Sequence, residues 1–287
     1  MIVVTEGTSA YGRLVVRHLL TRVPAGRVAV TTTDPEQAAD LAALGVEVRQ
    51  EDYADPGNGA AIFADAERVL SNPPPGWIGR QTPSGSIDRA LARIEAVTEA
   101  GVPHLVHVGI INSERTYLKW HHALEGAVRR SGVPFTILRD NLHSEALLPA
   151  ARLALASGEF VCAFGGRTMA PAALTDYAEA AAIVLADGGH EGEVLELSGF
   201  GLTALGIASV FTLLADREIA LLEVSSASVA AALKNAGAAD EVAEELSDLY
   251  EATSRGEFSQ VGDDLDRILG HSHQLNEAAL RAALAAG

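Results

Sequence analysis

Short apolar runs alternate with longer segments of helical periodicity through the first half of the chain, which is 287 residues long. Runs that are apolar throughout are typical of strands covered by helices on both faces of a sheet. Strands and helices in strict alternation predict an α/β fold with a doubly wound parallel sheet. The expected strands are 2–5, 27–33, 46–50, 68–72, 104–109 and 134–139, and the expected helices are 12–22, 35–44, 86–100 and 117–131.

The rhythm changes after Asn141, which divides the chain into two expected parts. Residues 1–141 form the sheet domain, and residues 142–287 form a smaller substrate-binding lobe. Within the second part, 175–187 has the pattern of a helix and 193–199 that of a late strand. We expect the segment 170–198 to pack back on the sheet domain.

Charge and cysteine content exclude several function classes. The net charge of −17 argues against nucleic acid and anionic membrane surfaces as partners, because both attract basic patches. Cys162 is the single cysteine, so neither an internal disulfide nor a thiolate metal cluster is expected, and we predict no metal site. The start lacks the pattern of a signal peptide, and we expect a cytoplasmic protein.

A glycine-containing turn, VTEGTSAYGRL, follows the first expected strand. A strand, a glycine-rich turn and a helix form the pyrophosphate site of dinucleotide-binding folds. With this turn, the segments DPEQAADLAALGVEVRQEDYADP, SGVPFTILRDN and LTDYAEAAAIVLADGGHEGEVLELSG make the chain similar to the NmrA-like group of atypical short-chain dehydrogenases/reductases. Within that group it resembles the type 2 NAD(P)H quinone oxidoreductases. The resemblance covers nearly the whole chain and implies a Rossmann-like fold.

The chain departs from this family in the turn itself. The family pattern T-G-A-T-G-x-x-G maps onto Thr5 to Gly12, with Glu6 at the first glycine and Ser9 at the second. Gly7 stands at the alanine position, and the third glycine, Gly12, is kept. A carboxylate at Glu6 is expected to repel the phosphates that a helix N-terminus would otherwise attract.

Other cofactor contacts implied by the resemblance are changed as well. The arginine that meets the 2′-phosphate in NADP-using relatives is replaced by Thr33, followed by Asp34. Asn72 is followed by three prolines at 73–75, and Val108-Gly109 replaces the family's Thr-Ser. We therefore expect no bound cofactor, with Gly7, Thr8 and Gly12 only vestiges of a cofactor site.

Candidate acid and base groups lie on the helix expected at 117–131. Tyr117 and His121 share a helix face at a spacing of four residues, and His122 aligns best with a histidine found in quinone-reducing members of the family. Histidine titrates near neutral pH and therefore suits proton transfer. We predict as catalytic residues Tyr117, His121, His122, His143 and Glu6. For His121 and for His122, an exposed helix surface is the competing interpretation.

A substrate pocket is expected at the carboxyl edge of the sheet, where ligands of open α/β sheets bind. The candidate substrate-binding residues are Asn72, Trp77, His107, Trp120, Asp140, Asn141 and Leu142. A core position hydrogen-bonded to backbone is the alternative for His107, and buried packing is the alternative for both tryptophans.

Three functions are open at this point. The first is a cofactor-independent enzyme that isomerises, dehydrates or cyclises a conjugated carbonyl, polyketide or quinone-like compound. The second is an NAD(P)H-dependent quinone or carbonyl oxidoreductase with an unusual turn. The third is a non-catalytic sensor or regulator. The expected partner is a small aromatic or conjugated molecule, with neither nucleic acid nor membrane involved, and a homodimer is left open.

Overall fold

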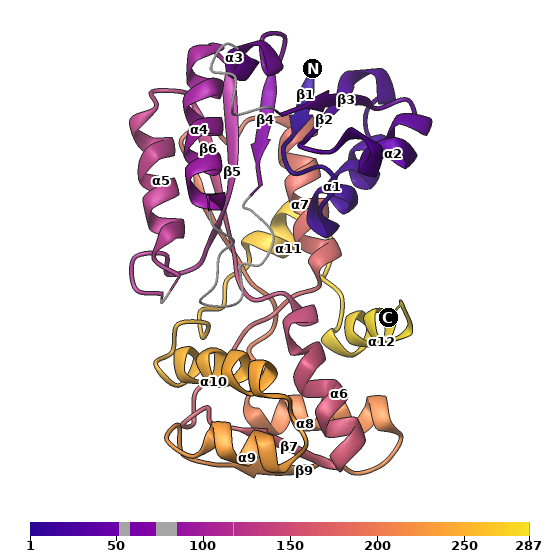
Figure 1. Ribbon diagram of the computed structural model, residues 1–287, viewed down its shortest axis with the longest axis vertical. Helices are drawn as coiled ribbons and strands as arrows, with labels where there is room; N and C mark the ends of the chain where they lie inside the picture. Colours follow the sequence, from indigo (N-terminus) through magenta and orange to yellow (C-terminus); the bar gives the residue numbers. More distant parts are fainter. Residues whose placement is uncertain (52–57, 73–84, 117, 287) are drawn as a thin grey trace.

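The computed structural model describes residues 1–51, 58–72, 85–116 and 118–286 (Figure 1). The strands are β1 Ile2–Val4, β2 Val28–Thr32, β3 Glu47–Gln50, β4 Arg68–Ser71, β5 His104–Ile110, β6 Phe135–Asp140, β7 Glu159–Cys162, β8 Val194–Leu197 and β9 Ala220–Glu223. The α-helices are α1 Ala10–Leu20, α2 Ala39–Ala43, α3 Asn58–Ile62, α4 Ser86–Glu99, α5 Trp120–Arg130, α6 Leu148–Ser157, α7 Leu174–Asp187, α8 Ala204–Ala215, α9 Val229–Asn235, α10 Asp240–Ser254, α11 Asp264–Leu269 and α12 Asn276–Ala286. Short 3-10 helices are η1 Ala25–Arg27, η2 Pro35–Ala38 and η3 Ser144–Leu147.

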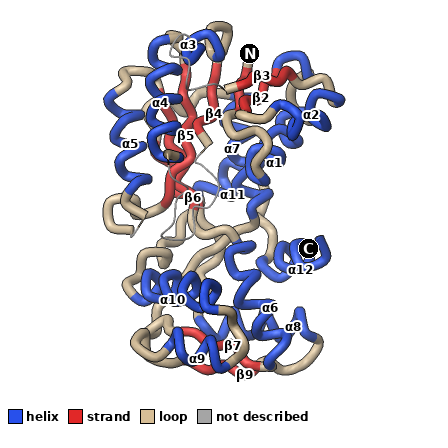
Figure 2. The backbone as a smooth tube through the Cα atoms, in the orientation of Figure 1, coloured by secondary structure: helices blue, strands red, loops and turns tan. Residues whose placement is uncertain are grey.

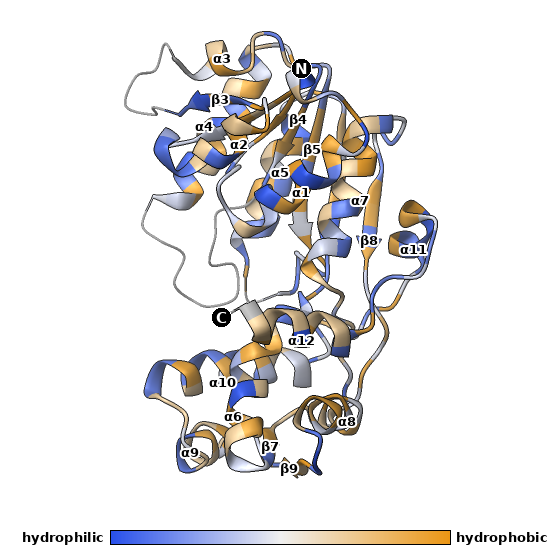
Figure 3. Cartoon of the chain, turned by 90° about the vertical axis from the view of Figure 1, so that its right-hand side faces the viewer, coloured by the Kyte–Doolittle hydropathy of each residue, from blue (hydrophilic) through white to orange (hydrophobic). Residues whose placement is uncertain are grey.

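Seven strands form one parallel sheet in the order β3-β2-β1-β4-β5-β6-β8. The chain starts in the middle of the sheet and builds outward in both directions, so the strand order reverses between β1 and β4. The central strand β5 is buried along its whole length, whereas the edge strand β3 is largely exposed and hydrophilic in Figure 3. The expected α/β fold with a doubly wound parallel sheet is confirmed.

Two layers of helices cover the sheet (Figure 2). Helices α1 and α7 pack together over one face, where Val15, Val16 and Val184 join the apolar side chains of β1 and β2. Helices α3, α4 and α5 cover the opposite face, where Ile94 and Leu124 pack on β4, β5 and β6. Each layer buries the apolar stripe of its helices, which supplies the main stabilisation of this fold.

A second body of structure lies beyond the carboxyl ends of the strands (Figure 1). The chain enters it directly from β6 through η3 and α6. A two-stranded parallel sheet, β7 and β9, and helices α6, α8, α9 and α10 surround a separate core that contains Phe160, Phe164, Phe211 and Tyr250. The aromatic rings of this core meet mostly edge to face, for example Phe160 and Phe211 at 5.0 Å between ring centroids.

Several elements differ from their sequence expectations. Helix α1 begins at Ala10 because the Ser9 hydroxyl caps it, accepting a hydrogen bond from the amide of Gly12 at 3.0 Å. The helix expected at 35–44 is divided into η2 and α2, and the helix expected at 117–131 begins at Trp120. Strands β7 and β9 were not expected. Helix α11, expected in the second lobe, packs on α7 and β8 through Leu265 and Leu269.

No helix in the described ranges is both long and apolar enough to span a membrane.

Candidate functional site

The turn between β1 and α1 keeps the backbone course that a glycine-rich turn requires. Glu6 has φ = 50°, in the left-handed region that favours glycine. The amide of Gly7 donates to the carbonyl of Thr31 at 3.0 Å, which ties the turn to β2. A Cβ on Gly7 would lie 2.4 Å from the Cβ of Val30, and one on Gly12 would lie 2.4 Å from the carbonyl oxygen of Glu6. Both glycines therefore permit close approach of backbone, as in a dinucleotide-binding turn.

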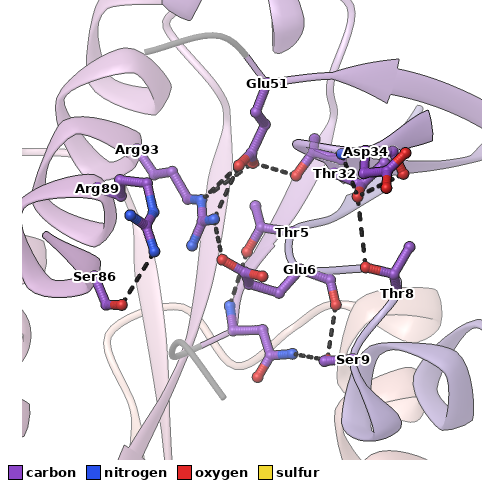
Figure 4. Close-up of polar contacts among 12 residues, drawn as sticks. Thr5, Glu6, Thr8, Ser9, Thr32, Asp34, Glu51, Ser86, Arg89 and Arg93 are labelled. Atoms are coloured by element: carbon purple, nitrogen blue, oxygen red, sulfur yellow. Dashed lines mark hydrogen bonds and ion pairs between the residues drawn. The ribbon is translucent and has the colours of Figure 1, made fainter. Parts of the chain in front are cut away.

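The Glu6 carboxylate is paired with a buried arginine (Figure 4). The guanidinium of Arg93, on α4, donates from Nη2 to Glu6 Oε1 and also, at 2.9 Å, to Oε2 of Glu51. Its Nε lies 3.1 Å and 3.2 Å from the two carboxylate oxygens of Glu51. The Thr31 hydroxyl donates to Glu51 as well. Arg93 is 2% exposed and Glu51 3%, so this is a buried cluster in which one cation serves two carboxylates.

The residues of the turn fit a pyrophosphate. The first amides of α1 have no partner within the helix, and the helix dipole adds partial positive charge at this end. The Glu6 side chain extends toward Arg93 on α4, while Ser9 and the start of α1 lie on the other side of the turn (Figure 4). Asn72, at the end of β4, holds the turn in place: its amide donates to Thr5 Oγ1 at 3.0 Å and its Nδ2 to Ser9 Oγ at 3.1 Å.

A second cluster lies where β6 ends, between α1 and α7. The ring of His143 stacks on Tyr11 at 6.2 Å between centroids and lies 5.4 Å from Tyr177. Its Nε2 is 3.9 Å from Oδ2 of Asp140. Burial raises the pKa of Asp140 well above its usual range and lowers that of His143 to about 3. Burial therefore favours the uncharged form of both groups, and Asp140 is the carboxyl of this cluster that can carry an exchangeable proton.

A third cluster joins β5 to the start of α5. His107 Nδ1 lies 3.2 Å from the Ser71 hydroxyl, and the His121 ring stacks on Trp120 at 3.7 Å between centroids. Burial lowers the pKa of His107 to about 4 and also lowers that of His121, where the nearby His107 contributes. Both histidines are fully buried and neutral at physiological pH.

Gly109 makes room for an ion pair beneath β5. A Cβ there would lie 2.8 Å from Oε1 of Glu125, and Glu125 in turn binds the guanidinium of Arg139 at 2.6 Å. The glycine at position 109 is therefore explained by its packing against Glu125.

The other predicted site residues are dispersed. His122 is exposed, whereas Leu142 is part of the second core. Asn141 donates from Nδ2 to the carbonyls of Phe258 and Gln260 and so connects β6 to the chain before α11. Gly7, Thr8 and Gly12 all lie in the turn. Tyr117 and Trp77, and the prolines at 73–75, fall outside the described residues.

No group of three metal-ligating side chains occurs in the part of the chain that the structure describes.

The sequence prediction missed Arg93, Glu51, Tyr11 and Tyr177. Of these four residues, only Tyr11 could have been found from the sequence, because it lies inside the turn motif. Arg93 and Glu51 are distant in sequence, and nothing in the local pattern connects either of them with Glu6.

Comparisons with known proteins agree with this geometry. A family model described as NAD(P)H-binding matches residues 7–146. Quinone oxidoreductase 2 of Escherichia coli strain K12 is 32% identical over 275 residues, which cover 94% of this chain and 94% of the relative.

Two solved structures match the whole chain. An NADPH-dependent quinone oxidoreductase from Escherichia coli, complexed with NADPH, matches with a TM-score of 0.88 at 29% identity over 99% of this chain and 100% of the other. A triphenylmethane reductase from Citrobacter sp. matches with a TM-score of 0.89 at 29% identity over 99% of each chain.

These findings contradict the expectation that no cofactor is bound, and they favour the oxidoreductase alternative over the cofactor-independent enzyme. The structure supplies the physical reason. From the sequence alone Glu6 has no partner and its charge opposes a phosphate, whereas in the fold Arg93 binds its carboxylate and its backbone adopts the glycine conformation. The chain therefore belongs to the NmrA-like family of NAD(P)H-binding proteins.

Proposed function

We propose that the protein is an NAD(P)H-dependent oxidoreductase that reduces a conjugated small molecule, with a quinone as the leading substrate class. The observation that carries this proposal is the turn at 5–12, which keeps its left-handed residue, its close-packed glycines and a capped helix N-terminus. The relatives named for quinone and dye reduction support the same substrate class.

The cofactor side of the site is built from the turn and α1. The amides at the start of α1 would bind the pyrophosphate, and Gly7 and Gly12 let the turn pack closely against β2 and α1. Arg93 binds the Glu6 carboxylate on the α4 side of the turn. When bound, the reduced nicotinamide supplies a hydride.

The acceptor side is built at the ends of β5 and β6. A quinone that has accepted a hydride needs one proton to become a hydroquinone. Burial raises the pKa of Asp140 and so favours its protonated form, and His143 lies 3.9 Å from it with a neutral imidazole. In this proposal Asp140 holds the proton, and His143 passes it to the reduced quinone. The ring of His143 packs against the rings of Tyr11 and Tyr177.

The test is cofactor oxidation followed by nicotinamide absorbance, with a panel of benzoquinones, naphthoquinones and triphenylmethane dyes as acceptors. We expect turnover that requires both cofactor and acceptor. His143→Asn is expected to lower kcat by about a hundredfold or more, the usual range for loss of a general acid, with cofactor affinity unchanged. His122→Asn is the matched control, because His122 is exposed, and it is expected to leave kcat unchanged. Cofactor binding without turnover of any acceptor would contradict the proposal and favour the sensor alternative.

A further inference from the structure

The end of β2 carries a fixed carboxylate next to the cofactor turn. Asp34 accepts hydrogen bonds from the amide of Glu36 at 3.1 Å and from Gln37 Nε2 at 2.9 Å, so both of its oxygens are held in place. Its own amide donates to Thr32 Oγ1, at 3.2 Å, and that hydroxyl is 3.4 Å from the hydroxyl of Thr8 in the turn (Figure 4). The backbone of Asp34 is thus connected to the turn through Thr32, while its carboxylate caps η2 beside it.

This position decides between the two nicotinamide cofactors in dinucleotide-binding folds. A carboxylate after the second strand accepts a hydrogen bond from the 2′-hydroxyl of the adenosine ribose of NADH, whereas an arginine there accommodates the 2′-phosphate of NADPH. We infer that this protein uses NADH in preference to NADPH, with Asp34 as the selecting residue. The inference rests on the proposed function.

Among the described residues, the two arginines beside this turn, Arg13 and Arg93, already bind other groups. Arg13 donates from Nε to the carbonyl of Thr8 at 3.1 Å, from Nη1 to Asp40 at 2.5 Å and from Nη2 to the carbonyl of Gln37. The hydrogen bond from Arg13 lowers the pKa of Asp40, as expected for a formed ion pair. Arg93 is bound by Glu6 and Glu51 on the other side of the turn.

A 2′-phosphate would therefore add negative charge next to the carboxylate of Asp34. Thr33, which follows β2 and is exposed, is uncharged. Like charges about 4 Å apart repel appreciably even with water-like screening, which corresponds to roughly a tenfold loss of affinity. The 2′-hydroxyl of NADH avoids this repulsion and gains a charge-assisted hydrogen bond.

Calorimetric titration of the full-length protein with NADH and, separately, with NADPH tests the inference. We expect NADH to bind about tenfold more tightly or better. Asp34→Asn should reduce this ratio severalfold by weakening NADH and strengthening NADPH; asparagine also caps helices well, so η2 is preserved. Thr33→Arg should strengthen NADPH alone, because the exposed side chain has room to point at the 2′-phosphate.

Glu36→Gln is the matched control, since it removes a neighbouring carboxylate that holds no hydrogen bond to the turn. It is expected to leave the ratio unchanged. NADPH binding as tightly as NADH, or more tightly, would overturn the preference, and an equal change in Glu36→Gln and Asp34→Asn would overturn the assignment to Asp34. If neither cofactor binds while circular dichroism shows a folded protein, the proposed function is wrong, and so is the inferred preference for NADH.

Discussion

The carboxylate of Glu6 is bound by the guanidinium of Arg93, which lies 87 residues further along the chain. This contact connects the cofactor turn to α4, on the opposite face of the sheet from α1. It also allows an acidic side chain to occupy a left-handed backbone position, which glycine adopts most readily.

Replacing Arg93 by methionine should strongly destabilise the protein. The change leaves Glu51 buried and Glu6 partly buried without their cation, and breaking a buried ion pair in this way costs about 3 to 5 kcal/mol. Urea denaturation measures the free energy of unfolding. Arg89→Met is the control, because Arg89 lies on the same helix and binds the neutral Ser86 hydroxyl, at 3.1 Å; its loss should stay below about 1 kcal/mol. Equal losses in the two variants would show that the pairing with Arg93 adds no stability.

The fold could be predicted from the sequence because its strands and helices show in short, continuous residue patterns. Each run of β-branched and aliphatic residues, such as Ile2–Val4, is a strand buried on both faces, and the alternation with helices determines the parallel sheet. Strands β7 and β9 were missed because each is four residues long and pairs with a segment far away in the sequence. Pairing of this kind depends on the second core rather than on local pattern.

The site was less predictable, because its key contacts are between distant residues. The sequence indicated the turn, His107, His121 and His143, but not which charges face one another. The sequence does not show that Arg93 binds Glu6, so Glu6 was expected to repel a phosphate. The expectation that no cofactor binds was wrong for this reason. The proposed roles of His143 and Asp140 depend on burial, which raises the pKa of Asp140 and lowers that of His143.

Gly12→Ala should impair cofactor binding. The added Cβ would lie 2.4 Å from the Glu6 carbonyl oxygen and 2.9 Å from the Gly7 Cα, and both are backbone atoms that cannot rotate away. We expect at least about a tenfold loss of NADH affinity and a loss of stability of about 1 to 3 kcal/mol. Fluorescence titration and urea denaturation measure the two effects. Gly26→Ala, where a Cβ meets nothing within 4 Å, serves as the control and should bind NADH normally. Normal binding by both variants would refute the close approach at Gly12.

His107 should make the protein sensitive to acid. Burial lowers its folded pKa to about 4, against about 6.5 in the unfolded chain. Between these values the unfolded state binds more protons, so the free energy of unfolding falls as the pH decreases from about 6.5 to about 4. His107→Asn retains a polar group at the Nδ1 position near Ser71 but cannot titrate. The slope of unfolding free energy against pH should be smaller in this variant, by up to about 1.4 kcal/mol per pH unit. Identical slopes in the two proteins would mean that His107 titrates normally in the fold.

We propose that the turn at 5–12 binds a nicotinamide cofactor with Glu6 at its left-handed position. Hydrogen–deuterium exchange of the whole protein, followed by mass spectrometry with and without saturating NADH, measures this binding at the turn. We expect slower exchange in peptides that cover residues 5–13 and 31–34 when NADH is present, and no change in peptides from α9 and β9. Unchanged exchange in the turn, or protection confined to the second lobe, would contradict it.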